Sequence, residues 1–234
     1  MTQPSYWQRR QQRARTVGSR DEVLVIGLGR FGSSLARTLI EMGHDVMALD
    51  SDAQRVQDHL QVVTHVLQAD CTNADVLRKV GIENITTAVV CIGTDIESSV
   101  LSVAALVDLD VPNIWAKAIT ESHGRILERV GAKKVVYPER EMGKRTAHLL
   151  TGTMLEYIAL DDDFVLVEIP VRQQFDGVRL GSSDLRAKHH ITIVCVKHGT
   201  DPFTYTTADT VLHQGDLIVI SGHRQHVERF AEGR

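Results

Sequence analysis

The chain has 234 residues, 43% of them apolar and 24% charged, with a formal net charge of −4. These values are typical of a globular protein with room for one full domain and a smaller one. No apolar run approaches the roughly 20 residues that span a bilayer, and three widely spaced cysteines argue against a disulfide framework or a zinc site, so we expect a cytoplasmic protein.

Residues 1–20 hold five arginines and no acidic residue, which predicts a basic flexible arm. Contact of this arm with anionic lipid headgroups or an acidic protein face stays open as an alternative to a plain disordered tail. The rest of the chain is net acidic, so we do not expect nucleic acid as a partner.

Residues 21–138 alternate between short, β-branched apolar segments and stretches with apolar residues at helical spacing. Six strands are predicted: Val23–Ile26, Asp45–Leu49, His65–Gln68, Ala88–Ile92, Ile114–Ala118 and Lys134–Tyr137. Gly43 and Gly131 follow the first and fifth predicted helices, where they would end them. The pattern predicts an α/β domain with a doubly wound parallel sheet and the first strand in the centre.

Over residues 139–153, the pattern predicts a helix that leaves the sheet, Glu139–Leu150, followed by a hinge at Thr151-Gly152-Thr153. Residues 154–234 predict a small α+β lobe. Its expected parts are an acidic turn at Asp161–Asp163, strands at Val165–Pro170, Ile191–Val196 and Leu217–Ile220, and helices near Ser182–Lys188 and Arg224–Ala231.

The first predicted strand is followed by Gly27-Leu28-Gly29-Arg30-Phe31-Gly32, which precedes a helical pattern. Glycines at this spacing allow a tight turn, a close approach to a phosphate and close packing of helix on strand. Asp50 ends the second strand, where an acid accepts hydrogen bonds from ribose hydroxyls and disfavours the 2′-phosphate of NADP. A nucleotide site is therefore predicted, with a glycine turn kept only for packing as the alternative.

Other polar residues follow the third, fourth and fifth strands, at the same edge of the sheet. Asp70-Cys71 and Ile92-Gly93-Thr94 should face the same nucleotide, although Asp70 is as well explained as a cap for the helix that begins near Asn73. Lys117 would neutralise phosphate charge, or equally extend into solvent from the strand end. Cys71 has no neighbouring base in the sequence and is expected to pack rather than react.

Glu139 directly follows Pro138 at the end of the sixth strand. A carboxylate near a polyphosphate needs a bridging cation, but from spacing alone a helix-start acid explains it better. The short-chain dehydrogenase pair of Tyr and Lys, the nucleophile elbow and the Walker lysine are not found. We therefore predict a sensor rather than an enzyme.

The chain resembles the regulators of conductance of potassium (RCK domains), specifically the KtrA/TrkA-type cytosolic subunits of potassium uptake systems. The resemblance is carried by four motifs: Val25–Gly32, Val111–Ala118, Pro138–Gly143 and Leu185–Lys188. It implies a Rossmann-like N-terminal lobe (RCK_N), a crossover helix within residues 139–153 that drives dimerisation, and a C-terminal lobe (RCK_C). It also implies dimers that assemble into an octameric ring beneath a membrane-embedded potassium-translocating subunit, on the inner face of the cell membrane.

The resemblance further implies that ATP and ADP compete for one site and that NAD(H) is a second ligand class. Arg30 would contact the terminal phosphate, and Glu139 would hold a divalent cation (Mg or Ca) near the phosphates at the dimer interface. Some relatives bind cyclic di-AMP in the C-terminal lobe, which would involve Arg186 and Ala187, or this loop would pack at an interface. The full nucleotide set is Gly27, Gly29, Arg30, Phe31, Gly32, Asp50, Ser51, Asp70, Cys71, Ile92, Gly93, Thr94, Lys117 and Glu139.

Two alternative functions stay open. One is an NAD-dependent oxidoreductase or an NAD(H)-sensing regulator. The sequence lacks the catalytic residues that the oxidoreductase would need. The other is a redox-sensing transcription regulator, for which a twenty-residue arm is too short to supply a winged helix.

Overall fold

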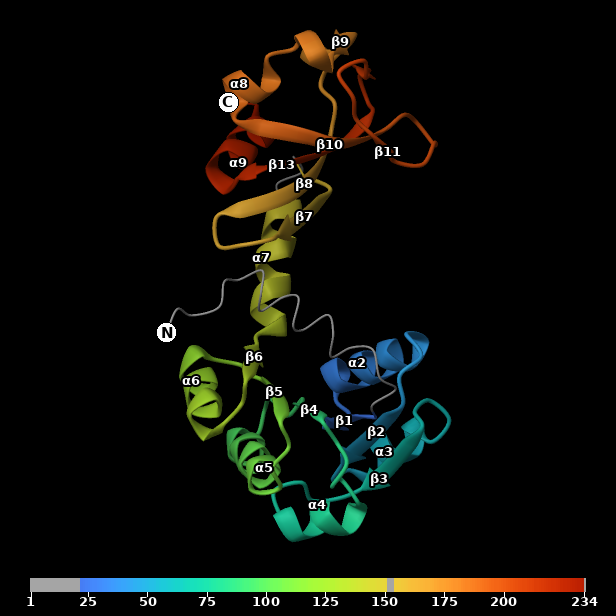
Figure 1. Cartoon of the computed structure of the whole chain (residues 1–234), viewed down its shortest axis with the longest axis vertical. Helices are drawn as coiled ribbons and strands as arrows, with labels where there is room; N and C mark the ends of the chain where they lie inside the picture. The colour runs from blue at the N-terminus through green and yellow to red at the C-terminus, as the bar shows by residue number, and fades with distance from the viewer. Residues whose placement is uncertain (1–21, 151–153, 234) are drawn as a thin grey trace. The chain divides into compact units, whose positions relative to one another are not determined.

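The structure is a computed structural model that describes residues 22–150 and 154–233. The predicted arm (1–20) and hinge (151–153) lie outside the described residues. The chain divides into two compact units, one ending at Pro138 and the other beginning at Glu139. Each unit is described by itself below (Figure 1).

The first unit is a parallel sheet of six strands in the order β3-β2-β1-β4-β5-β6. The predicted central position of the first strand is confirmed, because β1 pairs with both β2 and β4. Its elements are β1 (Val23–Ile26), α2 (Arg30–Glu41), β2 (Val46–Asp50), α3 (Ala53–His59), β3 (His65–Gln68), α4 (Ala74–Val80), β4 (Thr87–Val90), α5 (Ile96–Asp108), β5 (Asn113–Lys117), α6 (Glu121–Val130) and β6 (Lys134–Val136).

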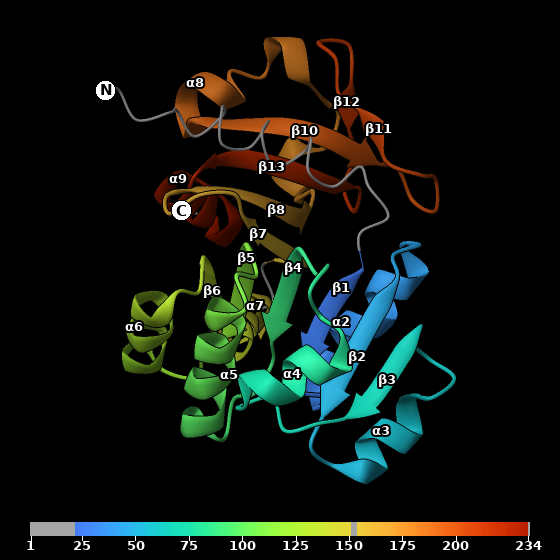
Figure 2. The same cartoon turned by 60° about the horizontal axis from the view of Figure 1, so that its bottom comes forward.

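Both faces of this sheet are covered by helices, which explains why its central strands are apolar throughout. Leu24 and Ile26 of β1 pack in one core with residues of α4, α5 and α6, whereas Val25 packs in a second core with residues of α2. Figure 2 shows the first unit from a second direction, with α4 and α5 in front of the strands. The chain order reverses direction between β1 and β4, so the carboxyl ends of these two strands meet at a switch point of the sheet.

The second unit is built on an antiparallel sheet in the order β11-β10-β13-β8-β7, beside a small pair of β12 with β9. Val227, Phe230 and Ala231 of α9 are buried in its core. The elements are α7 (Pro138–Leu150), β7 (Glu156–Ala159), β8 (Phe164–Pro170), η1 (Gln173–Phe175), β9 (Val178–Arg179), η2 (Leu180–Ser182), α8 (Leu185–His189), β10 (Ile191–Lys197), β11 (Thr204–Tyr205), β12 (Val211–Leu212), β13 (Leu217–His223) and α9 (Arg224–Glu232).

The predicted α/β sheet and the α+β lobe are both confirmed, with strand ends that differ from prediction by at most three residues. Four strands of the second unit were not predicted: β7, β9, β11 and β12. Among the described residues, no helix has both the length and the apolar character needed to cross a membrane.

Candidate functional site

The three glycines after β1 do three different things. Gly27 has φ of +93°, and its N–H donates to the Leu49 carbonyl over 2.7 Å, which turns the chain sharply out of β1. A Cβ on Gly32 would lie 1.9 Å from the Gly27 carbonyl oxygen, so only glycine lets α2 begin this close to the loop. A Cβ on Gly29 would meet no atom within 4 Å and would project into open space. Gly29 is thus the glycine of the three that is not required for packing within the chain.

Helix α2 begins without a side-chain cap. Its N-cap residue is Gly29, and its first turn holds no acidic residue. The next four helices of the unit are each capped by a side chain, from Asp52, Asn73, Asp95 and Thr120. The first N–H groups of α2 therefore have no side-chain acceptor, and they carry the partial positive charge that binds anions.

Two cationic side chains come from α2 and β5. Arg30 is exposed at the first position of α2. Lys117 is half-buried, with its ammonium 5.8 Å from the centre of the Phe31 ring and 3.3 Å from the position of a Cβ on Gly93. Lys117 therefore lies against the glycine loop and the β4 end rather than extending into solvent.

Asp50, at the end of β2, is only 5% exposed. One carboxylate oxygen accepts the Leu28 N–H over 2.6 Å, and the other accepts the Asp52 N–H over 2.9 Å. The Arg55 guanidinium approaches the first oxygen to 3.4 Å. Asp50 thus lies at the end of β2 as predicted, and it also holds the glycine loop; the ion pair with Arg55 was not predicted.

Beyond β3, the Asp70 carboxylate accepts both the hydroxyl and the N–H of Thr72, and these two hydrogen bonds, the hydroxyl first, lower its pKa. The alternative role of Asp70 as a helix cap is wrong. The cap of α4 is Asn73, whose side chain accepts the N–H of Asp75 over 2.9 Å. Asp70 is exposed and shapes its own turn.

The two cysteines near these strand ends are buried. Burial, with smaller contributions from the Asp70 and Asp50 charges, raises the pKa of Cys71 to about 12. Burial also raises the pKa of Cys91 to about 12 against the opposing charge of Lys117. A protonated, buried thiol packs rather than reacts, as expected for Cys71.

The remaining predicted residues lie at the same ends of the strands. Ile92 packs on Gly27, with its Cγ1 3.1 Å from the position of a Cβ there. Ser51 directly follows β2, Thr94 lies four residues beyond the end of β4, and both are exposed. The Ser51 carbonyl accepts the side-chain amide of Gln68 over 2.9 Å, which links the ends of β2 and β3. The structure thus brings the first-unit members of the predicted set to one edge of one sheet.

Glu139 is exposed in the first turn of α7 and belongs to the second unit, so its predicted place near the phosphates stays a prediction. Within the described ranges, no three His, Cys, Asp or Glu side chains are grouped in a way that could hold a metal ion.

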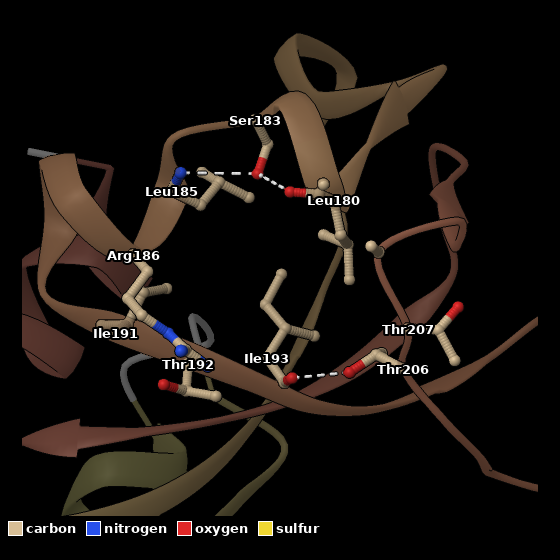
Figure 3. Close-up of a pocket in the computed structure, with 11 residues that line it drawn as sticks. Leu180, Ser183, Leu185, Arg186, Ile191, Thr192, Ile193, Thr206 and Thr207 are labelled. Atoms are coloured by element: carbon tan, nitrogen blue, oxygen red, sulfur yellow. Dashed lines mark hydrogen bonds between the residues drawn. The ribbon is translucent and has the colours of Figure 1, made fainter.

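The second unit contains a pocket of about 340 Å³ between α8, β10 and the segment 206–208 (Figure 3). Arg186 lines it and extends toward Thr192, and the Thr206 hydroxyl donates to the Ile193 carbonyl over 2.7 Å. Of the two residues predicted here, Arg186 lines the pocket, whereas Ala187 is an exposed residue of α8 outside the pocket lining.

Comparison with known proteins identifies two domain families. The TrkA-N domain matches residues 23–138, and the TrkA-C domain matches residues 164–232. Ktr system potassium uptake protein A of Bacillus subtilis is 36% identical over 88% of this chain and 93% of its own. Ktr system potassium uptake protein C of the same organism is 37% identical over 89% of this chain and 95% of its own.

Solved structures share the fold at lower identity. The RCK domain of GsuK has a TM-score of 0.60 at 21% identity, and the GsuK channel bound to NAD has a TM-score of 0.62 at 20% identity. Each match covers 92% of this chain but only 48% and 40% of those longer chains. At these sequence identities, the structural similarity supports the fold of the chain.

Proposed function

The chain carries a TrkA-N and a TrkA-C domain and belongs to the family of Ktr- and TrkA-type potassium uptake proteins, and we propose that it is a nucleotide-sensing regulatory subunit of a potassium transporter. In this proposal it acts in the cytoplasm, at the inner face of the cell membrane, and it senses ATP against ADP without catalysing a reaction.

The observation that carries the proposal is the phosphate cradle: Gly29 facing open space, the uncapped start of α2, Arg30 beside it and Lys117 against the loop. A polyphosphate needs close approach to backbone N–H groups and cationic side chains that neutralise its charge. These residues supply both, and Asp50 lies at the neighbouring strand end, where the ribose of a nucleotide bound on the cradle is expected.

The switch would depend on the terminal phosphate. A ligand shifts a conformational equilibrium only by its differential affinity for the two states, and ATP differs from ADP only by that phosphate. The guanidinium of an arginine such as Arg30 donates hydrogen bonds in a planar fork, which suits a phosphate. We assign to Arg30 the contact with the terminal phosphate, and the adenosine end to Asp50, Ser51, Asp70-Cys71 and Ile92–Thr94.

Assembly would involve α7. No residue of this helix is buried among the described residues, and Met142 and Leu150 are 56% and 80% exposed. Apolar side chains left exposed on one helix fit a contact with a second copy of the chain. We propose that such homodimers form the octameric ring and that Glu139 binds a divalent cation (Mg or Ca) near the phosphates at the dimer interface.

Two further ligands belong to the proposal. NAD(H) is the alternative occupant of the first unit, because its adenosine and pyrophosphate would use the same cradle. Cyclic di-AMP is proposed for the second unit, where a pocket with hydroxyl groups and the Arg186 guanidinium offers hydrogen-bond partners for a phosphodiester. The exposed position of Ala187 leaves Arg186 as the residue to test.

Titration of the purified protein with ATP, ADP, NADH and cyclic di-AMP tests this function, followed by calorimetry, thermal unfolding and sizing in solution. The proposal expects ATP and ADP to bind competitively and a ring-sized assembly to form. Stabilisation by NADH alone with no assembly would contradict it, and turnover of NADH with a substrate would favour the oxidoreductase.

A further inference from the structure

Arg55 lies in the first turn of α3, five residues after Asp50, and its guanidinium extends back to the end of β2. Its Nη1 is 3.4 Å from one Asp50 oxygen, and its Nε is 3.6 Å from the Asp52 carboxylate. The Arg55 side chain is 52% exposed, whereas the Asp50 side chain is 5% exposed. The Arg55 guanidinium is therefore open to solvent or a ligand, whereas the Asp50 carboxylate beside it is almost covered.

Backbone N–H groups use only part of the hydrogen-bonding capacity of the Asp50 carboxylate. Each of its oxygens accepts one backbone N–H, from Leu28 and from Asp52, and the oxygen that accepts Leu28 also accepts the Arg55 guanidinium over 3.4 Å. A carboxylate oxygen has two lone pairs, so one acceptor position is left over, on the oxygen that accepts the Asp52 N–H. Arg55 keeps further N–H donors close to this position, because a guanidinium has five.

A hydroxyl group fits such a pair, because it donates one hydrogen bond and accepts others. We propose that Arg55 is a specificity-determining residue that reads the ribose diol together with Asp50. The hydroxyl donates to Asp50, and its oxygen accepts from the Arg55 guanidinium. This inference rests on the proposed nucleotide-binding function and extends it to a residue five positions beyond the predicted acid.

The pair also defines which nucleotides are disfavoured. A deoxyribose that lacks the hydroxyl would lose both proposed hydrogen bonds, the one to Asp50 and the one from Arg55. A 2′-phosphate would meet two carboxylates, Asp50 and Asp52, against one guanidinium, so local charge disfavours it. The expected ligand class is a ribonucleotide with free hydroxyls at the 2′ and 3′ positions.

The test compares the affinities of the full chain for ATP and for 2′,3′-dideoxy-ATP, which lacks both hydroxyls. The wild-type chain should prefer ATP by about tenfold or more, as expected for hydrogen bonds to charged groups. Arg55→Ala should reduce this preference to about threefold or less by weakening ATP alone. Arg55→Lys keeps a cationic donor and should retain part of the preference. The ATP/ADP ratio should not change.

Arg78→Ala is the matched control, because Arg78 is also an exposed helical arginine paired with an aspartate three residues before it. It should leave both affinities unchanged. If Arg55→Ala weakened ATP and dideoxy-ATP equally, or changed neither, the inference would be overturned while nucleotide sensing stood. Failure of the wild-type chain to bind ATP would overturn nucleotide sensing itself, and this inference with it.

Discussion

The backbone N–H of Leu28 donates to the Asp50 carboxylate over 2.6 Å, which ties the glycine loop to the end of β2. Asp50 is therefore a structural acceptor before any nucleotide arrives. Its two backbone hydrogen bonds fix the loop and the carboxylate in one arrangement, so the proposed ribose contact is made by a group that is already oriented.

Removal of that acceptor should destabilise the first unit. Asp50→Ala leaves the N–H of Leu28 without its buried partner, which should lower the free energy of unfolding by about 1–3 kcal/mol. Urea denaturation measures this difference. Asp45→Ala, at an exposed aspartate just before the same strand, is the control and should change stability by less than about 0.5 kcal/mol. Equal effects of the two substitutions would contradict the structural role of Asp50.

The second and third glycines of the loop should respond differently to alanine. Gly32→Ala places a methyl group 1.9 Å from the Gly27 carbonyl oxygen, and the displacement of α2 should cost about 3 kcal/mol of unfolding free energy. Gly29→Ala meets no neighbouring atom and has an ordinary φ of −68°. It should keep the wild-type melting temperature and weaken ATP and ADP about tenfold, because the methyl group stands in the approach to the α2 N–H groups. If Gly29→Ala bound ATP and ADP as tightly as the wild-type chain does, the proposed phosphate cradle would be wrong.

The thiols of Cys71 and Cys91 should be inert in the folded protein. With pKa values raised to about 12 by burial, neither forms much thiolate at pH 8. A disulfide reagent at pH 8 should therefore modify at most the half-buried Cys195 until denaturant is added. Fast modification of two or three thiols in the native chain would contradict this prediction and revive a redox role.

His123 should make stability fall in mild acid. Its side chain is 1% exposed, and burial lowers its pKa below the ordinary value of 6.5. Below pH 6.5 the unfolded chain takes up a proton that the folded chain does not, so the free energy of unfolding decreases as pH falls through this window. The loss is about 1.4 kcal/mol for each unit by which the pKa is lowered.

The comparison of wild type with His123→Gln isolates this contribution from those of other histidines. Urea denaturation at pH 7.5 and at pH 5.0 should show a larger loss for the wild-type chain than for His123→Gln. Identical losses would mean that His123 titrates alike in the folded and unfolded chain.

The sheet of the first unit was predictable because its central strands are largely apolar runs separated by glycines and polar turns. The position of Asp50 followed from its place at the end of such a run. The unpredicted strands of the second unit are short or largely exposed: β11 has two residues, both exposed, and β7 lacks regular alternation. These segments are strands because they hydrogen-bond to neighbouring strands, and the spacing of apolar residues in the sequence does not predict that pairing.

The site was predictable at the level of strand ends but not of side-chain pairs. The Asp50–Arg55 pair depends on the start of α3, which Asp52 sets by capping the helix. Asp70 and Asn73 both lie near the start of α4, and only the geometry shows that Asn73 is the cap. The pocket of the second unit joins residues 180–193 with residues 206–208, segments that no local pattern connects.

The most direct test of nucleotide sensing is the affinity of Arg30→Ala for ATP and for ADP, measured by calorimetry beside the wild-type chain. Arg37→Ala, at an exposed position on the same helix, serves as the control. If Arg30 contacts the terminal phosphate, its loss should weaken ATP about tenfold and ADP less than about twofold, as for one charge-assisted contact. Equal weakening of ATP and ADP, or no change in either, would contradict the claim that Arg30 distinguishes the two nucleotides.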